Sequence, residues 1–328
     1  MIKKVHLKKL NRFLVLIISI ELLLSIFFLF KFYWNTTLPR ETFETGVTLC
    51  LQEGRRYTIN EAQMEAGACD IEISSDEDFA KLAVVNKGLS NVRSIYFRKT
   101  PNTSLPPEIG NLKNLTVLNF HHTFNTSLPP EIGQLKKLKV LKLDQADIEN
   151  IPPEIGDLTS LTSLILINNA KKIALPAEIK KLKNLQELAL SFNPEVELPS
   201  TLAKIQSLED LDLADSNIRE IPISVYQLRN LRILNLSSNE IASISAEINL
   251  LSSLIGLKLS DNNLVNLPSF SGLYNLNSLD LSNNKLINLP DGIVFLRKLK
   301  YLNLSGNRLD INDVENLKKL LPETQIIY

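Results

Sequence analysis

Apolar and polar residues follow a pattern along the last two thirds of the chain that returns about every 23 residues. Its clearest marker is a Leu or Ile followed by Pro. The marker stands at Leu105, Leu128, Ile151, Leu175, Leu198, Ile221, Leu267 and Leu289, and Ser245 replaces the Pro after Ile244. A fixed period of this length indicates a stack of similar units rather than a single globule.

Each unit contains two different apolar patterns. Leucines such as Leu234 and Leu236 alternate with polar residues, which predicts a short strand with one buried face. After the Pro, apolar residues such as Ile109, Leu112 and Leu115 occupy every third position, which predicts a short helical turn with one apolar face. A unit of this size cannot bury its own leucines, so neighbouring units must cover them.

An Asn recurs three residues after the second strand leucine. It stands at Asn169, Asn193, Asn239, Asn262, Asn284 and Asn307. A sharp turn leaves buried backbone groups that need partners, and an amide side chain offers both donors and an acceptor. We therefore expect a column of Asn side chains that joins successive turns. Thr123 and Ser216 can substitute in part, whereas Ala146 cannot, so the column should be weakest near Ala146.

The order L-x-x-L-x-L-x-x-N-x-L over about residues 92–328 resembles the leucine-rich repeat (LRR) family. The period is similar to that of the 23-residue class of Ras-group LRR proteins and their bacterial look-alikes. The resemblance implies an α/β solenoid, a curved horseshoe with a parallel sheet on its concave face, and it implies a binding scaffold without naming a ligand. Four of the earlier units depart from the family, because Asn102, Asn125, Lys171 and Glu195 stand where an apolar loop residue is usual.

The two ends of such a stack need caps, since terminal repeats would otherwise expose their leucines. Residues 92–310 are predicted to form the repeats, 49–91 the N-terminal cap and 311–328 the C-terminal cap. The C-terminal cap is predicted to be a helix whose apolar residues are Val314, Leu317, Leu320 and Leu321, followed by a last strand at 325–328.

The beginning of the chain predicts a membrane segment. Residues 1–12 are basic, residues 13–30 are an apolar run interrupted by Glu21 and two serines, and aromatic residues extend the run to 34. This predicts one transmembrane helix at 13–34 that acts as an uncleaved signal anchor, with a cleaved signal peptide as the alternative. Positive charges are concentrated before the segment, so the N-terminus is predicted to be cytoplasmic and the repeats extracytoplasmic. Residues 35–48 are then a polar tether.

Both cysteines of the chain, Cys50 and Cys69, lie in the predicted N-terminal cap. If that cap faces an oxidising compartment, a disulfide between them would close a loop of about 20 residues and contribute about 3 kcal/mol. The alternative is a pair of unpaired thiols.

The sequence offers no sign of catalysis or of a cofactor. It has no H-E-x-x-H, C-x-x-C or G-x-S-x-G motif and no phosphate-binding glycine loop. His121 and His122 should point to opposite faces of a strand, which argues against a metal site. Asp210, Asp212 and Asp215 lack the spacing of a calcium loop and are interpreted as a solvated acidic face. Lys plus Arg equals Asp plus Glu at 36 each, and no basic patch with aromatic residues suits nucleic acid.

The predicted concave face remains as a binding site for a protein or peptide. Its candidate residues are Tyr96, Arg98, His121, His122, Lys142, Ile165, Ile167, Phe192, Asp210 and Asp212. Ile165, Ile167 and Phe192 are expected to form an exposed apolar patch, which usually marks a contact site. Two functions stay open: a membrane-anchored, non-catalytic recognition protein, and a structural or envelope-organising scaffold.

Overall fold

The computed structural model describes residues 70–73, 92–100, 104–124, 126–148 and 150–328. The chain divides into two compact units, Met1–Leu49 and Cys50–Tyr328, and every described residue lies in the second. The predicted anchor at 13–34, the tether at 35–48, Cys50 and Cys69 lie outside the described residues. Within the described ranges, no helix has the length and the apolar character that crossing a membrane requires.

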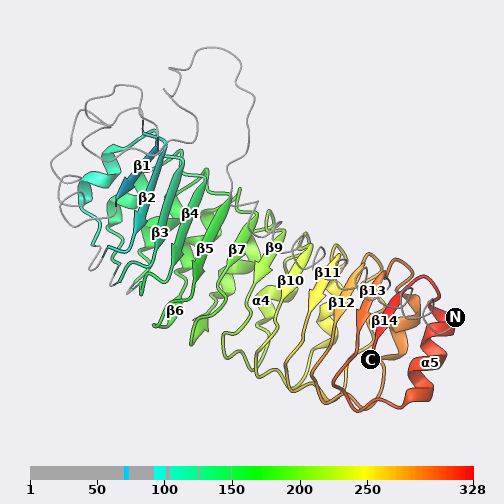
Figure 1. The fold of residues 1–328 in the computed structure, drawn as a ribbon. Helices are drawn as coiled ribbons and strands as arrows, with labels where there is room; N and C mark the ends of the chain where they lie inside the picture. Colours follow the sequence, from blue (N-terminus) through cyan, green and yellow to red (C-terminus); the bar gives the residue numbers. More distant parts are fainter. Residues whose placement is uncertain (1–69, 74–91, 101–103, 125, 149) are drawn as a thin grey trace, which may run out of the picture. The chain divides into compact units, whose positions relative to one another are not determined.

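Twelve parallel strands form one sheet whose order follows the chain (Figure 1). They are β1 (Asp70–Ile73), β2 (Ser94–Arg98), β3 (Val117–His121), β4 (Val140–Asp144), β5 (Ser163–Ile167), β7 (Glu187–Ala189), β9 (Asp210–Asp212), β10 (Ile233–Asn235), β11 (Gly256–Lys258), β12 (Ser278–Asp280), β13 (Tyr301–Asn303) and β14 (Gln325–Ile327). The register sets equivalent leucines opposite one another, such as Leu211 and Leu234. The strand predicted for each repeat is therefore confirmed.

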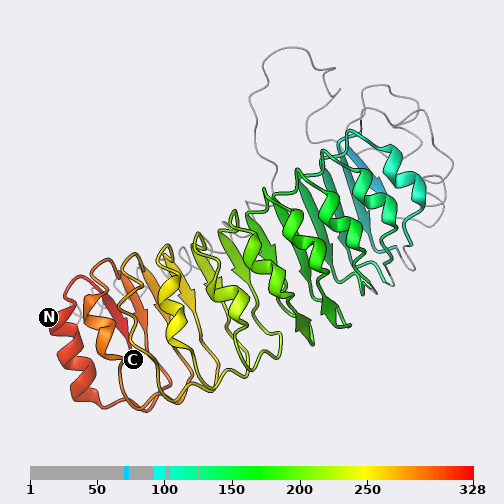
Figure 2. The same ribbon diagram turned by 180° about the vertical axis from the view of Figure 1, so that it is seen from behind.

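Short helical turns cover the other side of the sheet (Figure 2). They are the 3₁₀ helices η1 (Pro107–Asn111), η2 (Pro130–Gln134), η3 (Pro153–Asp157), η4 (Ala177–Lys181), η5 (Ser200–Lys204), η6 (Ala246–Leu250) and η7 (Asp291–Phe295), and the α-helix α4 (Ile223–Tyr226). Ile109 lies in η1, Leu112 and Leu115 follow it, and all three are buried, so the apolar face predicted for this segment continues past the end of the helix.

One repeat departs from the prediction of a helical turn in every unit. Between η6 and η7 the described chain has no helix. Phe270 follows Leu267 by three residues, whereas the equivalent Ile248 follows Ile244 by four. Phe270 is fully buried and fills the same core position as Ile248. The missing residue leaves too little chain for a helical turn at this position.

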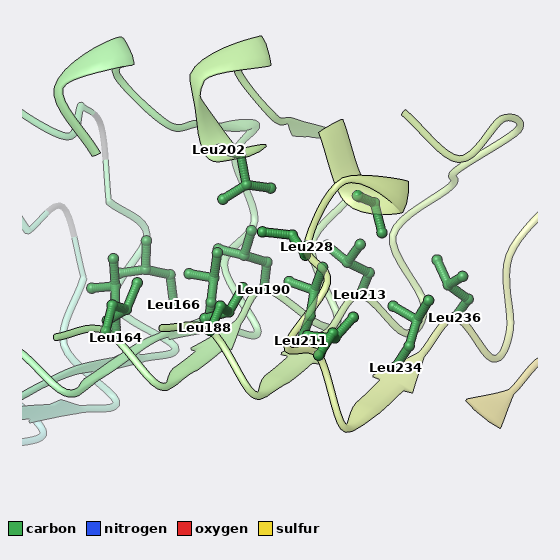
Figure 3. Packing of buried hydrophobic residues seen from close by; sticks show 14 of the residues in the cluster. Leu164, Leu166, Leu188, Leu190, Leu202, Leu211, Leu213, Leu228, Leu234 and Leu236 are labelled. Atoms are coloured by element: carbon green, nitrogen blue, oxygen red, sulfur yellow. The ribbon is translucent and has the colours of Figure 1, made fainter. Parts of the chain in front are cut away.

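Leucines from successive repeats form one continuous core. Figure 3 shows leucines of β5, β7, β9 and β10 stacked in a row, with Leu202 and Leu228 packed on them from the helical side. Their exposed fraction is zero or close to it. Each fully buried Leu contributes about 1.5–3 kcal/mol relative to an exposed one, so repeats that would be unstable alone stabilise one another.

The predicted Asn column is confirmed. The Oδ1 atom of Asn239 accepts hydrogen bonds from the N–H groups of Ser216 and Ile218 at 3.1 and 2.9 Å. Its Nδ2 atom donates to the carbonyls of Leu213 and Leu236 at 2.8 and 3.0 Å. Asn193, Asn262, Asn284 and Asn307 repeat the donor bonds to the strands around them. These amides therefore satisfy the buried backbone groups of the turns.

At both ends, the sheet contains a strand that lies outside residues 92–310, the range predicted to form the repeats. β1 lies within the predicted N-terminal cap and pairs with β2 in the register of the repeats, with Ile71 and Ile73 fully buried. At the other end, α5 (Ile311–Leu320) precedes β14 as predicted. Leu320, one of the apolar residues of the predicted helix, is exposed over 56% of its surface. Val314, Leu317 and Leu321 occupy the buried face of α5, and Leu320 lies off it.

A second sheet is made of only two strands. β6 (Ile173–Ala174) and β8 (Val196–Glu197) pair in parallel outside the long sheet. They belong to the repeats that place Lys171 and Glu195 in the loop. Lys172 forms ion pairs with Glu195 and Glu197 beside these strands. The two repeats thus hold these loops together by pairing with each other.

Candidate functional site

The strand face of the sheet is formed by the side chains that point away from the leucine core. Because side chains alternate along a strand, these residues stand on either side of each strand leucine. We call the outward residues from β2 to β9, with the three residues that follow each strand, the N-terminal strand face. The outward residues from β10 to β13 and those that follow them are the C-terminal strand face. All ten predicted binding residues lie on the N-terminal strand face.

A left-handed backbone position precedes the Asn position in every repeat. The residues are Lys99, His122, Gln145, Asn168, Phe192, Asp215, Ser238, Asp261, Asn283 and Gly306, with φ between 49° and 68°. Asn, Asp and Gly tolerate this conformation, whereas it costs other residues about 1–2 kcal/mol. Phe192 is the only one of these residues with an apolar aromatic ring, and 53% of its surface is exposed. The fold therefore holds a large apolar ring in an unfavourable backbone conformation and in contact with solvent.

His121 and His122 lie against each other. Their ring centroids are 4.2 Å apart in an edge-to-face arrangement. The expectation that they point to opposite faces was wrong, because His122 has a φ of 54° and its side chain turns back towards that of His121. Among the described residues, no group of three His, Cys, Asp or Glu side chains is arranged to hold a metal ion.

Asp144 joins the residues of three neighbouring strands. Its Oδ2 atom lies 3.2 Å from Nδ1 of His121 and 3.6 Å from Nζ of Lys142. Its Oδ1 atom accepts a hydrogen bond from Nδ2 of Asn168 at 3.0 Å. Asp144 itself is buried. The predicted residues His121 and Lys142 are thus brought together by a carboxylate that the sequence analysis did not select.

Two buried oxygen atoms lie beside this cluster without a hydrogen-bond partner among the described residues. They are Oδ1 of Asn119 and Oε1 of Gln145. A buried acceptor left unsatisfied costs about 1–3 kcal/mol. A partner that donates a hydrogen bond to either atom would remove this cost. Asn119 lies between Tyr96 and Lys142 in the register of the sheet, in the middle of the predicted site.

The predicted apolar patch is smaller than expected. Phe192 is exposed, Ile167 is half-buried, and Ile165 is only 5% exposed. Ile165 lies directly between Lys142 and Ala189 on the adjacent strands, so neighbouring side chains cover it. The prediction that Ile165 offers an exposed contact was therefore wrong, and Phe192 is the main apolar side chain that a partner can reach here.

Carboxylates occupy the end of the N-terminal strand face nearest to β10. Asp210 is half-buried and Asp215 is exposed, but Asp212 is only 6% exposed. The interpretation of a wholly solvated acidic face was thus wrong for Asp212. Burial raises the pKa of its carboxyl, which the hydrogen bond from the Ala214 N–H at 3.0 Å opposes. Glu187 accepts a hydrogen bond from the Ser163 hydroxyl at 2.6 Å.

The opposite end of the N-terminal strand face carries Tyr96 and Arg98. Tyr96 is half-buried and Arg98 is exposed. The Nε atom of Arg98 lies 3.8 Å from a carboxylate oxygen of Glu72. Glu72 belongs to β1, which the sequence analysis had placed in the cap, so this contact was not predicted. The N-terminal strand face therefore runs from a basic, aromatic end to an acidic end.

The C-terminal strand face satisfies its own polar groups. Oδ1 of Asp280 accepts hydrogen bonds from both the N–H and the hydroxyl of Ser282, at 3.0 and 2.6 Å. Asn303 makes the same two bonds with Ser305 at 3.1 and 2.8 Å. A partner would gain little from binding these groups, because its hydrogen bonds would have to replace local ones that already exist.

Comparisons with known proteins agree with the repeat architecture. A family model described as a leucine-rich repeat region matches residues 70–197, and a leucine rich repeat model matches 229–286 and 252–309. The first match begins at β1, as the pairing of that strand with the repeats also indicates. No curated protein matches the chain.

Solved structures share the fold. An LRR protein of Leptospira interrogans is 25% identical, with a TM-score of 0.48, and the match covers 84% of this chain and all of that one. The LRR ectodomain of the Arabidopsis receptor kinase HAESA, solved with a peptide hormone, is 26% identical over 74% of this chain and 42% of its own, with a TM-score of 0.58. TLR13 bound to a single-stranded RNA is 26% identical over 76% of this chain and 40% of its own, with a TM-score of 0.59.

This chain therefore spans less than half the length of the two receptor chains, HAESA and TLR13. Proteins built from such repeats typically mediate protein–protein binding and are generally non-catalytic scaffolds. The repeat period, the parallel sheet with its Asn column and the two family matches lead to one conclusion: the chain belongs to the leucine-rich repeat proteins.

Proposed function

We propose that this chain is a membrane-anchored recognition protein that binds a protein or peptide partner on its N-terminal strand face. The anchor is residues 13–34, preceded by the basic residues 1–12, with the repeats on the extracytoplasmic side. The polar residues 35–48 tether the cap and repeats to the anchor.

The observation that carries the binding site is the exposed ring of Phe192 on a left-handed residue. Neither the backbone nor the core gains from an aromatic side chain at this position. Asn and Asp at the equivalent positions in neighbouring repeats would be easier to accommodate. Aromatic side chains are enriched among the residues that dominate binding energy at interfaces, so contact with a partner explains a Phe here.

Polar groups on β3, β4 and the residue that follows β4 lie on the same strand face and support the same site. The oxygens of Asn119 and Gln145 are buried, so each can accept a hydrogen bond from a partner only after its side-chain amide turns outward. His121 and Lys142, which lie beside Asp144, can donate hydrogen bonds to a partner. An extended peptide supplies both donors and acceptors along its backbone, which fits this mixture.

The charge of the N-terminal strand face favours a protein or peptide over a nucleic acid. Glu187, Asp210, Asp212 and Asp215 would repel a phosphate backbone, which proteins usually bind through Lys and Arg. The HAESA ectodomain was solved with a peptide hormone and TLR13 with RNA, so the shared fold accepts either. The acidic side chains of this chain favour the peptide.

The binding proposal is tested with the full chain, purified in detergent, as bait for proteins from its own cells. A partner that is retained should then be measured against Phe192→Ala and Ile167→Ala. Each substitution should weaken binding by about 1–2 kcal/mol while leaving the unfolding temperature nearly unchanged. Ser260→Ala and Ser278→Ala on the C-terminal strand face are the matched controls. Loss of binding in the controls but not in the first pair would refute the proposed site.

The proposed topology has its own test. Protease added to intact cells or spheroplasts should digest the repeats while the chain stays in the membrane fraction. Complete protection of the repeats would refute the orientation. Release of the chain from the membrane fraction would favour a cleaved signal peptide.

An extracytoplasmic cap also leads us to propose the disulfide between Cys50 and Cys69. A non-reduced digest analysed by mass spectrometry should contain the linked peptides. Two freely alkylated thiols in protein taken from its own compartment would refute the pairing.

A further inference from the structure

The helix face, formed by the helical turns and the residues that follow them, carries exposed apolar side chains at its C-terminal end. Among the described residues, large apolar side chains exposed before residue 220 are those of Phe124 and Phe192. After residue 220 they are Ile223, Leu250, Val265, Tyr274, Ile287, Phe295, Ile311, Leu320 and Tyr328. Ile223, Leu250, Tyr274 and Phe295 of this set lie on the helix face, and exposed apolar side chains gathered on one face usually mark a contact site.

Three of these side chains lie on successive turns. Leu250 is the last residue of η6, Phe295 is the last residue of η7, and Tyr274 belongs to the turn between them. Their exposed fractions are 42%, 60% and 55%. Hydrogen bonds join the turns: Gly272 N to Asn249 Oδ1 at 2.7 Å, Asn275 Nδ2 to Ser252 O at 2.9 Å, and Lys298 Nζ to Asn275 Oδ1 at 2.6 Å. We call Leu250, Tyr274 and Phe295 the helix-face patch.

The turn between η6 and η7 lies close to η6. A Cβ atom on Gly272 would lie 2.5 Å from the carbonyl oxygen of Asn249, so only glycine fits without a shift. This is the repeat that is one residue shorter between Leu267 and Phe270 and that has no helical turn. The close approach of the two backbones brings the turn of Tyr274 against the end of η6. Leu250 and Tyr274 therefore belong to one surface.

Arg297 and Lys298 stand beside this patch, Arg229 lies one repeat before it, and further basic side chains occupy the earlier turns of the helix face. The basic residues are Lys113, Lys136, Lys137, Lys180, Lys181, Lys183, Lys204, Arg229, Arg297 and Lys298, and all are exposed. Glu108, Glu131, Glu154, Glu178 and Asp157 on the same face are half-buried, and Glu247 is exposed. Basic residues thus predominate at the surface of this face. The strand face has the opposite balance, because its carboxylates outnumber its Lys and Arg.

Most of these lysines do not neutralise a carboxylate. Lys113 donates to the amide oxygen of Gln134, and Lys137 donates to that of Asn114. Lys181 is the exception, because it pairs with Asp157 at 3.1 Å. An open cleft of about 530 Å³ between η4 and η5 is lined by Lys180, Lys181, Lys183, Ala203, Lys204 and Gln206. Positive charge is therefore available to an anionic surface.

We propose that the helix face docks on an anionic lipid bilayer, with the helix-face patch entering the headgroup region. Aromatic and aliphatic tips beside Lys and Arg are the combination that binds such an interface. Lysine predominates, and its flexible point charge suits a diffuse layer of phosphates better than it suits base recognition. The lysine-lined cleft has no aromatic side chain on which bases could stack, which disfavours single-stranded nucleic acid. This contact leaves the strand face open to a partner.

Tryptophan fluorescence of the full chain tests this proposal, because Trp34 is the only Trp of the sequence. In a Trp34→Phe background, Phe295→Trp places a single fluorophore in the helix-face patch. Phe192→Trp in the same background is the control on the strand face. Vesicles of phosphatidylcholine and phosphatidylglycerol with brominated acyl chains should quench the Phe295→Trp variant at least about twofold and leave the control unchanged. Arg297→Gln together with Lys298→Gln should reduce this quenching.

Several outcomes would overturn the proposal. Quenching of Phe295→Trp no greater than that of Phe192→Trp would show that the patch does not enter the bilayer. Equal quenching by vesicles of phosphatidylcholine alone would remove the role of the anionic headgroup. A blue shift of Phe295→Trp emission that grows with protein concentration in the absence of vesicles would identify a second copy of the chain as the occupant. Circular dichroism checks that each variant is folded.

Discussion

The two halves of the long sheet differ in the length of their strands, although their leucine cores are equally buried. Strands β2 to β5 each have five residues, whereas β7 and β9 to β13 each have three. The difference follows the residue between the two strand leucines. In the later strands this residue is usually Asp or Asn, as in Asp212, Asn235, Asp280 and Asn303.

These side chains compete with the sheet for backbone hydrogen bonds. Asp212, for example, accepts the N–H of Ala214, and Asn235 accepts that of Ser237. An N–H that is bound by its own strand's side chain no longer extends the ladder to the adjacent strand. Ala189 in β7 and Lys258 in β11 make no such bond, but each of their strands lies next to one that does. The later strands are therefore three residues long.

This difference indicates where binding energy is available. On the C-terminal strand face, Asp280 and Asn303 already have their donors in Ser282 and Ser305. On the N-terminal strand face, Asn119 keeps an acceptor without a donor, although it occupies the same position as Asn235. The five-residue strands β2 to β5 have thus kept regular pairing and left side-chain groups for a partner. In most of the three-residue strands, the corresponding Asp or Asn binds the backbone of its own strand instead.

The largest loss of stability is expected from a substitution that interrupts the Asn column in the C-terminal half of the sheet. In Asn262→Ala, the N–H of Ile241 and the carbonyls of Leu236 and Leu259 lose their partner. Because these groups stay buried, the free energy of unfolding should fall by about 2–4 kcal/mol, as measured by urea denaturation. Ser260→Ala, two residues away and half-buried, should change it by less than about 0.5 kcal/mol. A loss no larger than that of this control would contradict the role assigned to the column.

The next-largest change in stability is expected when the types of residue at the left-handed position are exchanged between the two strand faces. Phe192→Asn should raise the free energy of unfolding by about 1 kcal/mol, because Asn accepts this conformation more readily than Phe. Asn283→Phe in the C-terminal half should lower it by about 1–2 kcal/mol for the same reason.

Both variants of this exchange are measured by urea denaturation, and Phe192→Asn is also tested for binding of the retained partner. Greater stability together with weaker binding would show that Phe192 serves recognition at the expense of the fold. If Phe192→Asn lowered stability, the backbone argument for the site would be wrong.

Periodicity alone predicted the repeat architecture. The spacing of leucines determines the strand, and the spacing of Ile109, Leu112 and Leu115 determines the turn. The Asn column was also predictable, because buried turns must satisfy their backbone groups. These predictions succeeded because each rests on a pattern repeated many times within one chain.

The binding site was less predictable because it depends on exposure and on neighbours that the repeat pattern does not specify. The pattern shows that Ile165 points away from the core, but only the sheet shows that Lys142 and Ala189 cover it. The alternation of side chains along a strand also does not predict the left-handed φ of 54° that turns His122 towards His121. The signal for Leu250, Tyr274 and Phe295 was present as apolar residues outside the leucine positions of their turns.

A smaller effect concerns the competition between side chains and the sheet. Asp280→Ala removes the acceptor of the Ser282 N–H and hydroxyl and should lower the free energy of unfolding by about 1 kcal/mol. Hydrogen exchange of the Ser282 amide reports directly on this bond and should become faster. Ser278→Ala on the same strand is the control. Unchanged exchange at Ser282 would show that Asp280 does not determine where β12 ends.

The smallest effect concerns the pH dependence of stability and the border between the two halves at Asp212. Burial raises the pKa of this carboxyl above its ordinary value, so the folded chain binds a proton more tightly than the unfolded chain does. Stability should therefore fall as pH rises from the ordinary Asp range, near 4, through the raised pKa of the folded state.

Asp212→Asn should be more stable than the parent at pH 7, because its amide carries no buried charge and its oxygen can still accept the Ala214 N–H. The difference should shrink as the pH falls through the raised pKa of the folded state, because the parent carboxyl then also loses its charge in the fold. Urea denaturation of both chains between pH 4 and 8 measures this, with Asp215→Asn as the exposed control. A parent chain that is more stable than Asp212→Asn at pH 7 would show that the carboxylate's hydrogen bonds and the attraction of Lys258 outweigh its burial.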